Sequence, residues 1–268
     1  MSNKIGIVGC AGRMGRMLTE VIGRTENCTV SGGTELPGSP DLNKDLGELA
    51  GIGSLGVKVG DNPKTLFSSC DVVIDFSVPT ATLNHAKLAA ETGCSLVVGT
   101  TGMTNEQVAE LETAGSKTSI VFARNMSLGV NLLMSIVEQV AASLDEDYDI
   151  EVVEMHHRYK IDSPSGTALA LGEAAASGRG VDLDKVADKV RDGIIGARKR
   201  GDIGFATLRG GDVVGDHSVI FAADGERIEL GHKATNREVF ARGAVKAANW
   251  LEGKPNGFYD MRDVLGLK

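Results

Sequence analysis

The sequence predicts an α/β protein with a doubly wound parallel sheet and a second, smaller α+β domain. From Lys4 to Asn125, short apolar strand patterns alternate with helical patterns. These strands are continuous apolar runs, as expected when helices cover both faces of a parallel sheet. After Asn125 the alternation stops, and a long apolar helix is followed by several strand patterns. The 268 residues are enough for two hydrophobic cores.

The first half begins with a predicted strand, tight turn and helix. The β-rich run from Lys4 to Val8 passes through glycines into a segment with apolar residues at helical spacing, from Met14 to Ile22. A second strand ends at Glu35 and leads into a Pro/Gly/Ser loop. The further predicted elements are a strand at 71–77, a helix from about Pro79, a strand at 95–102, a helix from about Thr104 and a strand at 119–125.

The second half is predicted to mix helices with a different set of strands. The expected elements are a long apolar helix at 127–144, a strand at 149–156 and a hairpin at 218–230. The hairpin is predicted because Asp224 and Gly225 supply the positive φ values of a two-residue turn. Thr235 and Glu238 form the Thr-x-x-Glu pattern of a capping box, which predicts the start of the last long helix.

Composition and charge argue against several classes of protein. The formal net charge is −8, which disfavours nucleic acid or an anionic membrane as a partner. The sequence has neither an apolar span of 18 residues nor a basic region followed by a long apolar run. The cysteines lack CxxC pairs and nearby histidines, which favours free thiols over a zinc site; they are Cys10, Cys28, Cys70 and Cys94. We therefore expect a cytoplasmic protein without a metal site.

A glycine turn lies between the first predicted strand and the first predicted helix. Gly9, Gly12 and Gly15 differ by one residue in their first interval from G-x-G-x-x-G, so the pattern alone is weak evidence. A purely structural turn is the alternative. In this context, however, glycines let the backbone approach a pyrophosphate, and the helix N-terminus attracts its charge. The context favours a dinucleotide site.

Carboxylates stand at the ends of two predicted strands. Glu35 ends the second strand, where a carboxylate can bind the adenosine ribose hydroxyls of a dinucleotide. It should repel a 2′-phosphate, and the next residue is Leu36, so the sequence favours NADH over NADPH. Arg13 in the glycine turn could reach a 2′-phosphate, which leaves use of both cofactors open. Asp75 and Ser77 are predicted to organise a strand end rather than to catalyse.

Residues 154–169, EMHHRYKIDSPSGTAL, concentrate basic groups in an acidic protein. His156, His157, Arg158 and Lys160 precede a Ser-Gly-Thr helix start, and such groups can hold a small anion. A solvated loop and, for Arg158, a structural ion pair are the alternatives. On a straight strand His157 would face away from Lys160, so their joint action requires a bend, which the following Ser-Pro-Ser-Gly run favours.

Six segments, in order, match the pattern of a known family. They are GCAGRMG (9–15), VVIDFS (72–77), VVGTTG (97–102), ARNMSLGVN (123–131), EMHHRYKIDSPSGTA (154–168) and ELGHKATNREVFARGA (229–244). On these motifs the chain resembles the 4-hydroxy-tetrahydrodipicolinate reductases, or dihydrodipicolinate reductases, of bacterial lysine and diaminopimelate synthesis. The match covers essentially the whole chain, and six ordered segments are far more specific than one motif.

The resemblance implies a Rossmann domain and a smaller α+β domain, with a C-terminal helix that returns to the first. Residues 1–126 and 237–268 are accordingly expected to bind the dinucleotide, and residues 127–236 to bind substrate and support oligomerisation. A homotetramer is implied as well. Leu36 departs from the family pattern, because many relatives carry an arginine there and use it on NADPH.

The resemblance also implies the cofactor site. The expected reaction is hydride transfer from NADH or NADPH to the unsaturated cyclic imine that 4-hydroxy-tetrahydrodipicolinate forms by loss of water, giving tetrahydrodipicolinate. The residues implied in cofactor binding are Gly9, Cys10, Ala11, Gly12, Arg13 and Met14 at the pyrophosphate, Glu35 at the ribose, and Gly99, Thr100, Thr101, Ala123, Arg124, Asn125 and Met126 at the nicotinamide end.

The substrate site follows from the same resemblance. His156 and Lys160 are implied as catalytic residues, one of which protonates the enamine left by hydride transfer; the choice between them stays open. The residues implied in binding the small dicarboxylate are His157, Ser165, Gly166, Thr167 and Thr101. Two other functions stay open: a related dehydrogenase of another small carboxylated substrate, and a catalytically silent nucleotide-sensing or assembly protein. The retained Lys160 argues against the silent protein.

Overall fold

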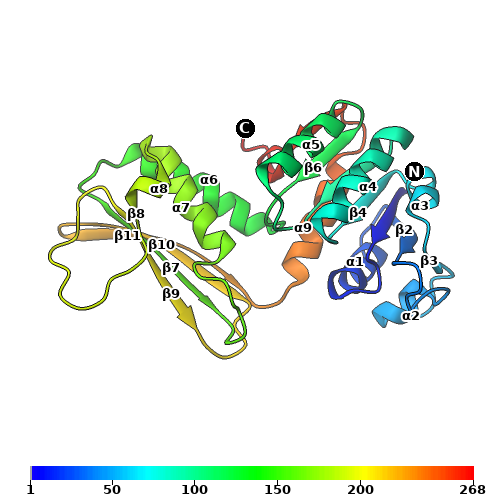
Figure 1. Cartoon of the computed structure of the whole chain (residues 1–268), viewed down its shortest axis with the longest axis horizontal. Coiled ribbons are helices and arrows are strands. Elements are labelled where there is room, and N and C mark those ends of the chain that lie inside the picture. The colour runs from blue at the N-terminus through cyan, green and yellow to red at the C-terminus, as the bar shows by residue number, and fades with distance from the viewer. Residues whose placement is uncertain (1) are drawn as a thin grey trace. The chain divides into compact units, whose positions relative to one another are not determined.

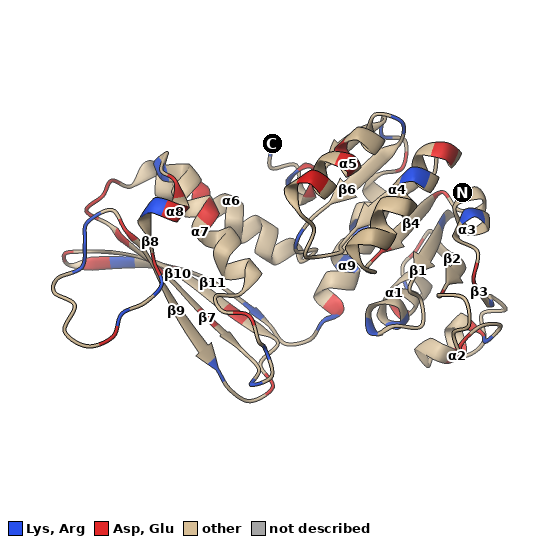
Figure 2. Cartoon of the chain, in the orientation of Figure 1, with Lys and Arg blue, Asp and Glu red and all other residues tan. Residues whose placement is uncertain are grey.

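The computed structural model describes residues 2–268, which form two compact units (Figure 1). The first unit contains the chain up to Ser127 together with Glu238–Gly266, and the second contains Leu128–Arg237. Lys and Arg residues are interspersed with Asp and Glu residues in both units (Figure 2). Within residues 2–268, no helix has the length and apolar character needed to cross a membrane.

The first unit is built on a parallel sheet of seven strands in the order β12-β6-β5-β4-β1-β2-β3. The direction of winding reverses between the neighbouring strands β1 and β4, so their carboxyl ends flank the crevice where open α/β sheets bind ligands. The strands are β1 (Asn3–Val8), β2 (Cys28–Thr34), β3 (Val59–Gly60), β4 (Val72–Asp75), β5 (Ser95–Val98), β6 (Ser119–Phe122) and β12 (Gly257–Tyr259).

Helices cover both faces of this sheet, as the apolar strands predict. α1 and α9 contact each other, and α9 also contacts β4 and β5, whereas α4 contacts both α3 and α5. All residues of β4 are buried, and Phe67, Val73 and Leu96 belong to one core cluster. The predicted doubly wound sheet is confirmed. The helices are α1 (Arg13–Gly23), α2 (Leu46–Ala50), α3 (Pro63–Ser69), α4 (Pro79–Thr92), α5 (Asn105–Gly115), α9 (Glu238–Trp250) and α10 (Met261–Leu265).

The second unit has a mixed sheet of five strands in the order β11-β10-β7-β9-β8. β10 is antiparallel to β7 and β11, and β7 is parallel to β9. α6 and α7 pack against each other, and α7 contacts β7, β9 and β10. The predicted α+β character is confirmed. The elements are α6 (Leu128–Ser143), β7 (Asp149–His156), α7 (Gly166–Arg179), α8 (Leu183–Val186), β8 (Ala187–Asp188), β9 (Ile203–Arg209), β10 (Gly215–Ala223) and β11 (Glu226–Ala234).

Strand β7 alternates strictly between a buried and a half-buried face. Its buried residues are Ile150, Val152, Glu154 and His156. The first two belong to the apolar core beneath α6 and α7. Glu154 and His156 lie on the same buried face, nearer the carboxyl end of the strand. Burial of ionisable side chains such as these is rare.

One sequence prediction is wrong in detail. In the β10–β11 turn only Gly225 has a positive φ, +89°, whereas Asp224 lies outside the left-handed region, so the turn does not have positive φ at both positions. The last long helix, predicted to follow the Thr235–Glu238 pattern, is confirmed and begins at Glu238. Glu238 therefore lies in the first turn of α9, where a carboxylate interacts favourably with the helix dipole.

Replacing Gly243 by alanine should destabilise the first unit. A Cβ built on Gly243 in α9 would lie 1.7 Å from the carbonyl oxygen of Met126. Backbone must then shift, and such overpacking costs about 1–3 kcal/mol. Thermal unfolding should give a lower Tm for Gly243→Ala than for Gly60→Ala, whose Cβ would meet nothing closer than Gly33 O at 3.9 Å. Equal Tm values for the two variants would contradict the close approach.

Candidate active site

The glycine turn connects β1 to α1. It has one glycine at a positive φ and one glycine where the helix packs closely against the turn. Gly9 has a φ of +67°, and its N–H and that of Cys10 both donate to Thr34 O, at 2.8 and 3.2 Å. A Cβ at Gly15 would lie 2.4 Å from Gly9 O, so this helix can approach the turn only with glycine there. Burial raises the pKa of Cys10 to about 12, which keeps the thiol uncharged. No side chain caps α1, whose N-cap is Gly12.

Glu35 follows β2 directly and lies against the glycine turn. Its Oε1 accepts a 2.8 Å hydrogen bond from Ala11 N, and its own N–H donates to Gly60 O. The carboxylate is half-buried, whereas the neighbouring Leu36 is 77% exposed. The structure therefore brings the predicted ribose carboxylate into contact with the predicted pyrophosphate turn, across 24 residues of sequence.

The remaining predicted cofactor residues follow β5 and β6, which are neighbours in the sheet. Gly99 N donates to Asp75 O, and Ala123 N donates to Val98 O, so each loop continues its strand pairing by one residue. Thr100 is buried and Thr101 exposed; Arg124 is exposed, Asn125 half-buried and Met126 buried. All these loops lie at the carboxyl edge of the sheet, as do the glycine turn and Glu35.

A buried carboxylate, Asp75, connects this edge to a helix. Its Oδ1 accepts hydrogen bonds from Ser77 N at 2.8 Å and Thr100 Oγ1 at 3.3 Å, and its Oδ2 contacts His85 Nδ1 at 2.8 Å. Burial alone would raise the pKa of Asp75, but the hydrogen bonds from His85 and Ser77 outweigh it and hold the pKa below its usual value. The prediction that Asp75 and Ser77 organise the strand end is confirmed. His85, on α4, carried no sequence signal for this contact.

In the second unit, the chain turns immediately after β7. β7 ends at His156, and Lys160 N donates to His157 O at 3.1 Å. The chain therefore bends between these residues, and the bend predicted for joint action of His157 and Lys160 is present. Lys160 Nζ pairs with Asp162 Oδ1 at 2.8 Å. The ring of His157 packs near Tyr159, and its buried Nδ1 has no hydrogen-bond partner among residues 2–268. Arg158, for which an ion pair stayed open, is exposed and pairs with no carboxylate in that part of the chain.

Helix α7 begins beside the end of β7. Ser165 is its N-cap, and Ser165 Oγ accepts from Ala168 N at 3.1 Å. The same hydroxyl lies 3.1 Å from Nε2 of His217, a residue of β10. Gly166 begins the helix in open space, since nothing lies within 4 Å of a Cβ built there. The start of a 14-residue helix and its dipole therefore stand next to the His156 strand end.

Three residues of this strand end were missed by sequence reasoning: Glu154, Arg209 and His217. Glu154 is 1% exposed and makes a 2.5 Å contact with His156 and two hydrogen bonds with Arg209. An acidic residue at an inward position of an apolar alternating strand was a signal that could have found Glu154. Arg209 and His217 lie 55 and 52 residues from their partners, so no local pattern points to them. Burial lowers the pKa of His217 to about 4.

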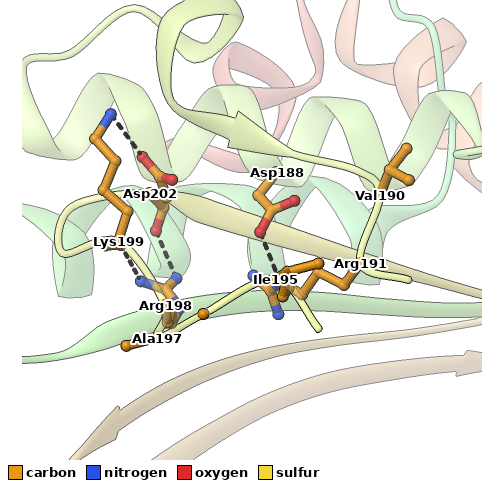
Figure 3. A pocket seen from close by; sticks show the side chains of 9 residues that line it. Asp188, Val190, Arg191, Ile195, Ala197, Arg198, Lys199 and Asp202 are labelled. Carbon is orange, nitrogen blue, oxygen red and sulfur yellow. Dashed lines mark hydrogen bonds and ion pairs between the residues drawn. The ribbon is translucent and has the colours of Figure 1, made fainter. Parts of the chain in front are cut away.

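A separate pocket of the second unit is lined by the loop between β8 and β9 (Figure 3). Arg191 donates to both oxygens of Glu151 at 2.9 Å, and Arg198 Nε donates to the same carboxylate. Arg191 also pairs with Asp188 (Figure 3). These cations are therefore neutralised by neighbouring carboxylates, and the residues that line this pocket include none of the predicted site residues.

Comparison with known proteins identifies the family. Residues 3–126 match the family description "Dihydrodipicolinate reductase, N-terminus", and residues 129–265 match "Dihydrodipicolinate reductase, C-terminus". The chain belongs to the dihydrodipicolinate reductase family. The predicted family is confirmed, and with it the prediction of an oxidoreductase of this family.

Relatives of this dihydrodipicolinate reductase family match over the whole chain. A 4-hydroxy-tetrahydrodipicolinate reductase of Ruegeria pomeroyi is 58% identical over 98% of each chain, and one of Parvibaculum lavamentivorans is 55% identical over 99% of this chain and 98% of its own. The solved structure of a dipicolinate-bound dihydrodipicolinate reductase from Paenisporosarcina sp. TG-14 covers 97% of this chain and 98% of its own, with 24% identity and a TM-score of 0.77. This structural likeness shows the shared fold.

The chemistry of the donor set fits a dinucleotide and gives no indication of a metal. Within residues 2–268, no group of three or more His, Cys, Asp or Glu side chains is placed to hold a metal ion. The turn at Gly9 offers backbone at a positive φ with open space around it, and α1 begins directly after it. These are the features by which a glycine turn accepts a pyrophosphate.

Removal of the Asp75 charge should destabilise the protein only at pH values at which the carboxylate of the folded protein is ionised. The pKa of Asp75 is lowered on folding from 3.8, so its contribution is fully present above 3.8 and is lost as the pH falls through the folded value. Asp75→Asn should lower the free energy of unfolding at neutral pH by about 1.5–3 kcal/mol, as expected for a hydrogen-bonded buried charge.

This is measured by denaturant unfolding of wild type and variant from neutral pH downward. The control is Glu91→Gln, an exposed residue of α4. A difference between wild type and Asp75→Asn that stays constant down to pH values well below 3.8 would contradict the role assigned to the carboxylate.

Proposed function

We propose that this protein catalyses the NAD(P)H-dependent reduction of 4-hydroxy-tetrahydrodipicolinate, through dihydrodipicolinate, to tetrahydrodipicolinate in diaminopimelate and lysine biosynthesis. The observation that carries the proposal is the 58% identity over 98% of both chains to a relative named for this activity. Each candidate site by itself supports it: the carboxyl edge of the first sheet suits a dinucleotide, and the end of β7 suits an anion.

The cofactor is assigned to the carboxyl edge of the first sheet. The backbone from Gly9 to Met14 would hold the pyrophosphate, and the loops at 99–101 and 123–126 would hold the nicotinamide end. When bound, the nicotinamide supplies the hydride. The buried, hydrogen-bonded Thr100 gives the loop after β5 a fixed position at this end.

We assign a preference for NADH over NADPH to Glu35. Its Oε1 accepts a hydrogen bond from Ala11 N, which holds the carboxylate beside the glycine turn, and we expect the ribose hydroxyls of the nucleotide there. The second oxygen would accept from a ribose hydroxyl, and the charge would repel a 2′-phosphate. Leu36 brings no compensating cation, while Arg13, exposed in the glycine turn, is the group through which some use of NADPH would persist.

The substrate is assigned to the end of β7. Ser165, Gly166 and Thr167, at the start of α7, would present hydroxyl and N–H groups to one carboxylate. His157 and Lys160 would supply donors or positive charge for the other. Hydride arrival at one end of the conjugated imine moves negative charge toward the other, giving an enamine that must be protonated.

We assign the proton to Lys160, with His156 as its neighbour in the same site. Burial lowers the pKa of His156 below its usual 6.5, and the charges of Lys160 and Arg209 add to this, against the opposing effect of Glu154. His156 is therefore largely neutral at physiological pH. An ammonium group is a proton donor that also stabilises the developing negative charge.

We further propose that the second unit carries the contacts of a homotetramer in the cytoplasm. β11 lies at the edge of its sheet and has mostly exposed side chains, so it offers a strand that can pair or pack between subunits. The net charge of −8 is consistent with a partner set limited to small molecules and copies of this chain, without nucleic acid or membrane.

Substitution of Lys160 by alanine should abolish most turnover and leave NADH binding nearly unchanged. Loss of an acid catalyst lowers kcat by about 10²- to 10⁴-fold. NADH oxidation is followed at the nicotinamide absorbance, with substrate generated in place from pyruvate and aspartate semialdehyde by the preceding synthase. Lys185→Ala, at an 80% exposed side chain of α8, serves as the control and should keep full activity.

Absence of NADH oxidation by folded wild type that still binds NADH would remove the proposed substrate. It would favour another small carboxylated substrate or a silent nucleotide-sensing protein. A parallel loss of NADH binding in Lys160→Ala would place this lysine in the cofactor site or the fold rather than at the substrate.

Replacing Glu35 by alanine should weaken the binding of NADH more than the binding of NADPH. The loss of hydrogen bonds to a charged group costs about 1.5–3 kcal/mol, or roughly a 10- to 150-fold increase in the NADH Kd. Titration calorimetry with both cofactors gives the two values, and Glu48→Ala, at an exposed residue of α2, is the control. Equal weakening of both cofactors would defeat the ribose assignment.

A further inference from the structure

The buried carboxylate of Glu154 contacts His156 and the start of α7 directly, and it is linked to the Lys160 turn through Arg209. It is 1% exposed and lies on the inward face of β7. Its partners come from the end of its own strand, from β9 and from the start of α7. A carboxylate removed from water needs such compensation, so the positions of these segments are coupled through one group.

The contact with His156 fixes the tautomer of the imidazole. His156 Nδ1 lies 2.5 Å from Glu154 Oε2. Other contacts lower the pKa of Glu154 in spite of its burial, so the carboxylate is ionised and can only accept. Nδ1 therefore carries the hydrogen, and Nε2 is the nitrogen left for other chemistry. A Cβ at Gly215 would lie 3.0 Å from Nε2, so glycine at that position leaves space beside this nitrogen.

Arg209 connects the same carboxylate to the Lys160 turn. Its Nη1 and Nη2 donate to the two oxygens of Glu154 at 2.7 and 2.9 Å, and Nη2 also donates to the carbonyl oxygen of Asp162 at 2.6 Å. Asp162 in turn pairs with Lys160 Nζ at 2.8 Å. The planar guanidinium makes this bidentate geometry specific, which an ammonium could not reproduce.

The third connection reaches the start of α7. Ser165 N donates to Glu154 Oε1 at 3.0 Å, so the N-cap residue of that helix is held by its backbone as well as by its capping side chain. The hydroxyl of Ser165 also contacts His217, whose ring lies edge-on to that of His156 at 5.0 Å between centroids. One carboxylate thus orients the imidazole, the lysine turn and the helix start together.

We infer that Glu154, held by Arg209, is a positioning residue of the active site: it aims Nε2 of His156 at the reacting substrate and fixes the Lys160 turn and the start of α7 in register with it. The identity of the reaction rests on the proposed function, whereas the orientation of His156 does not. Glu154 touches no reacting atom, so its effect must pass through His156 and Lys160.

Loss of the Glu154 charge should shift the pKa of His156 in a defined direction. The groups that face His156 are Glu154 on its own strand, Lys160 in the following turn, Arg209 on β9 and His217 on β10. Burial lowers the pKa of His156, Glu154 raises it, and the Lys160 and Arg209 charges lower it. Glu154→Gln therefore removes the stabilising anion, and the pKa of His156 must fall further.

The first experiment is 15N and 1H NMR of the histidine rings in the full chain, with His156 assigned by a His156→Gln spectrum. Wild type should show the tautomer with hydrogen on Nδ1 and a bare Nε2. In Glu154→Gln the pKa of His156 should fall and the tautomers should mix. Glu151→Gln is the matched control, because Glu151 is also on β7 and has two arginine partners but belongs to the opposite face. This substitution should change neither the pKa nor the tautomer of His156.

Kinetics provide the second readout. Glu154→Gln should lower kcat by at least about 10-fold, the scale expected when an imidazole loses its orienting carboxylate, with the KM for NADH unchanged. The limb of the kcat–pH profile that reports His156 should move to lower pH. Glu154→Asp keeps the charge. It should recover part of kcat and should return the limb of the kcat–pH profile part of the way to its wild-type pH.

Two results would overturn the inference. One is a wild-type spectrum in which Nε2 carries the hydrogen, which needs no variant to fold. The other is a Glu154→Gln protein whose kcat falls by the same factor at every pH while the His156 titration stays in place, as a merely structural role would give. If wild type does not reduce the proposed substrate, the proposed function fails, and the NMR comparison alone decides the role of Glu154.

Discussion

A buried carboxylate must find hydrogen bonds or opposite charge within the protein, and this constraint organises the candidate sites of both units. In the first unit Asp75 binds the loops after β4 and β5 and a histidine of α4. In the second, Glu154 binds the end of β7, an arginine of β9 and the start of α7. In each case the charge sits on an interior strand, and segments distant in sequence are held in place because they satisfy it.

This arrangement explains how flexible segments become fixed. Loops ordinarily vary in position because few contacts hold them, yet catalysis requires donors that are already oriented when charge develops. In the turn of Lys160, Asp162 pairs with the lysine and accepts a hydrogen bond from Arg209, and Arg209 in turn binds the strand carboxylate. Exposed ion pairs such as that of Arg200, whose side chain is 64% exposed, contribute little by comparison, since solvent screens them.

Glycine acts in the first unit through two different physical effects. Gly9 adopts a φ of +67°, which other residues rarely accept, whereas Gly15 and Gly243 are needed because backbone atoms lie where a Cβ would be. The glycine turn therefore depends on local conformation at its beginning and on close packing at its end. A spacing pattern reports both effects together and does not distinguish them.

The sequence by itself determined the parallel sheet, the glycine turn and the β7 strand, because apolar periodicity and glycine spacing are local properties of the chain. Motif order determined the family. Only the tertiary structure decided that Glu154 meets Arg209 and that Ser165 meets His217, since these partners lie more than 50 residues apart and no local pattern records which strands become neighbours.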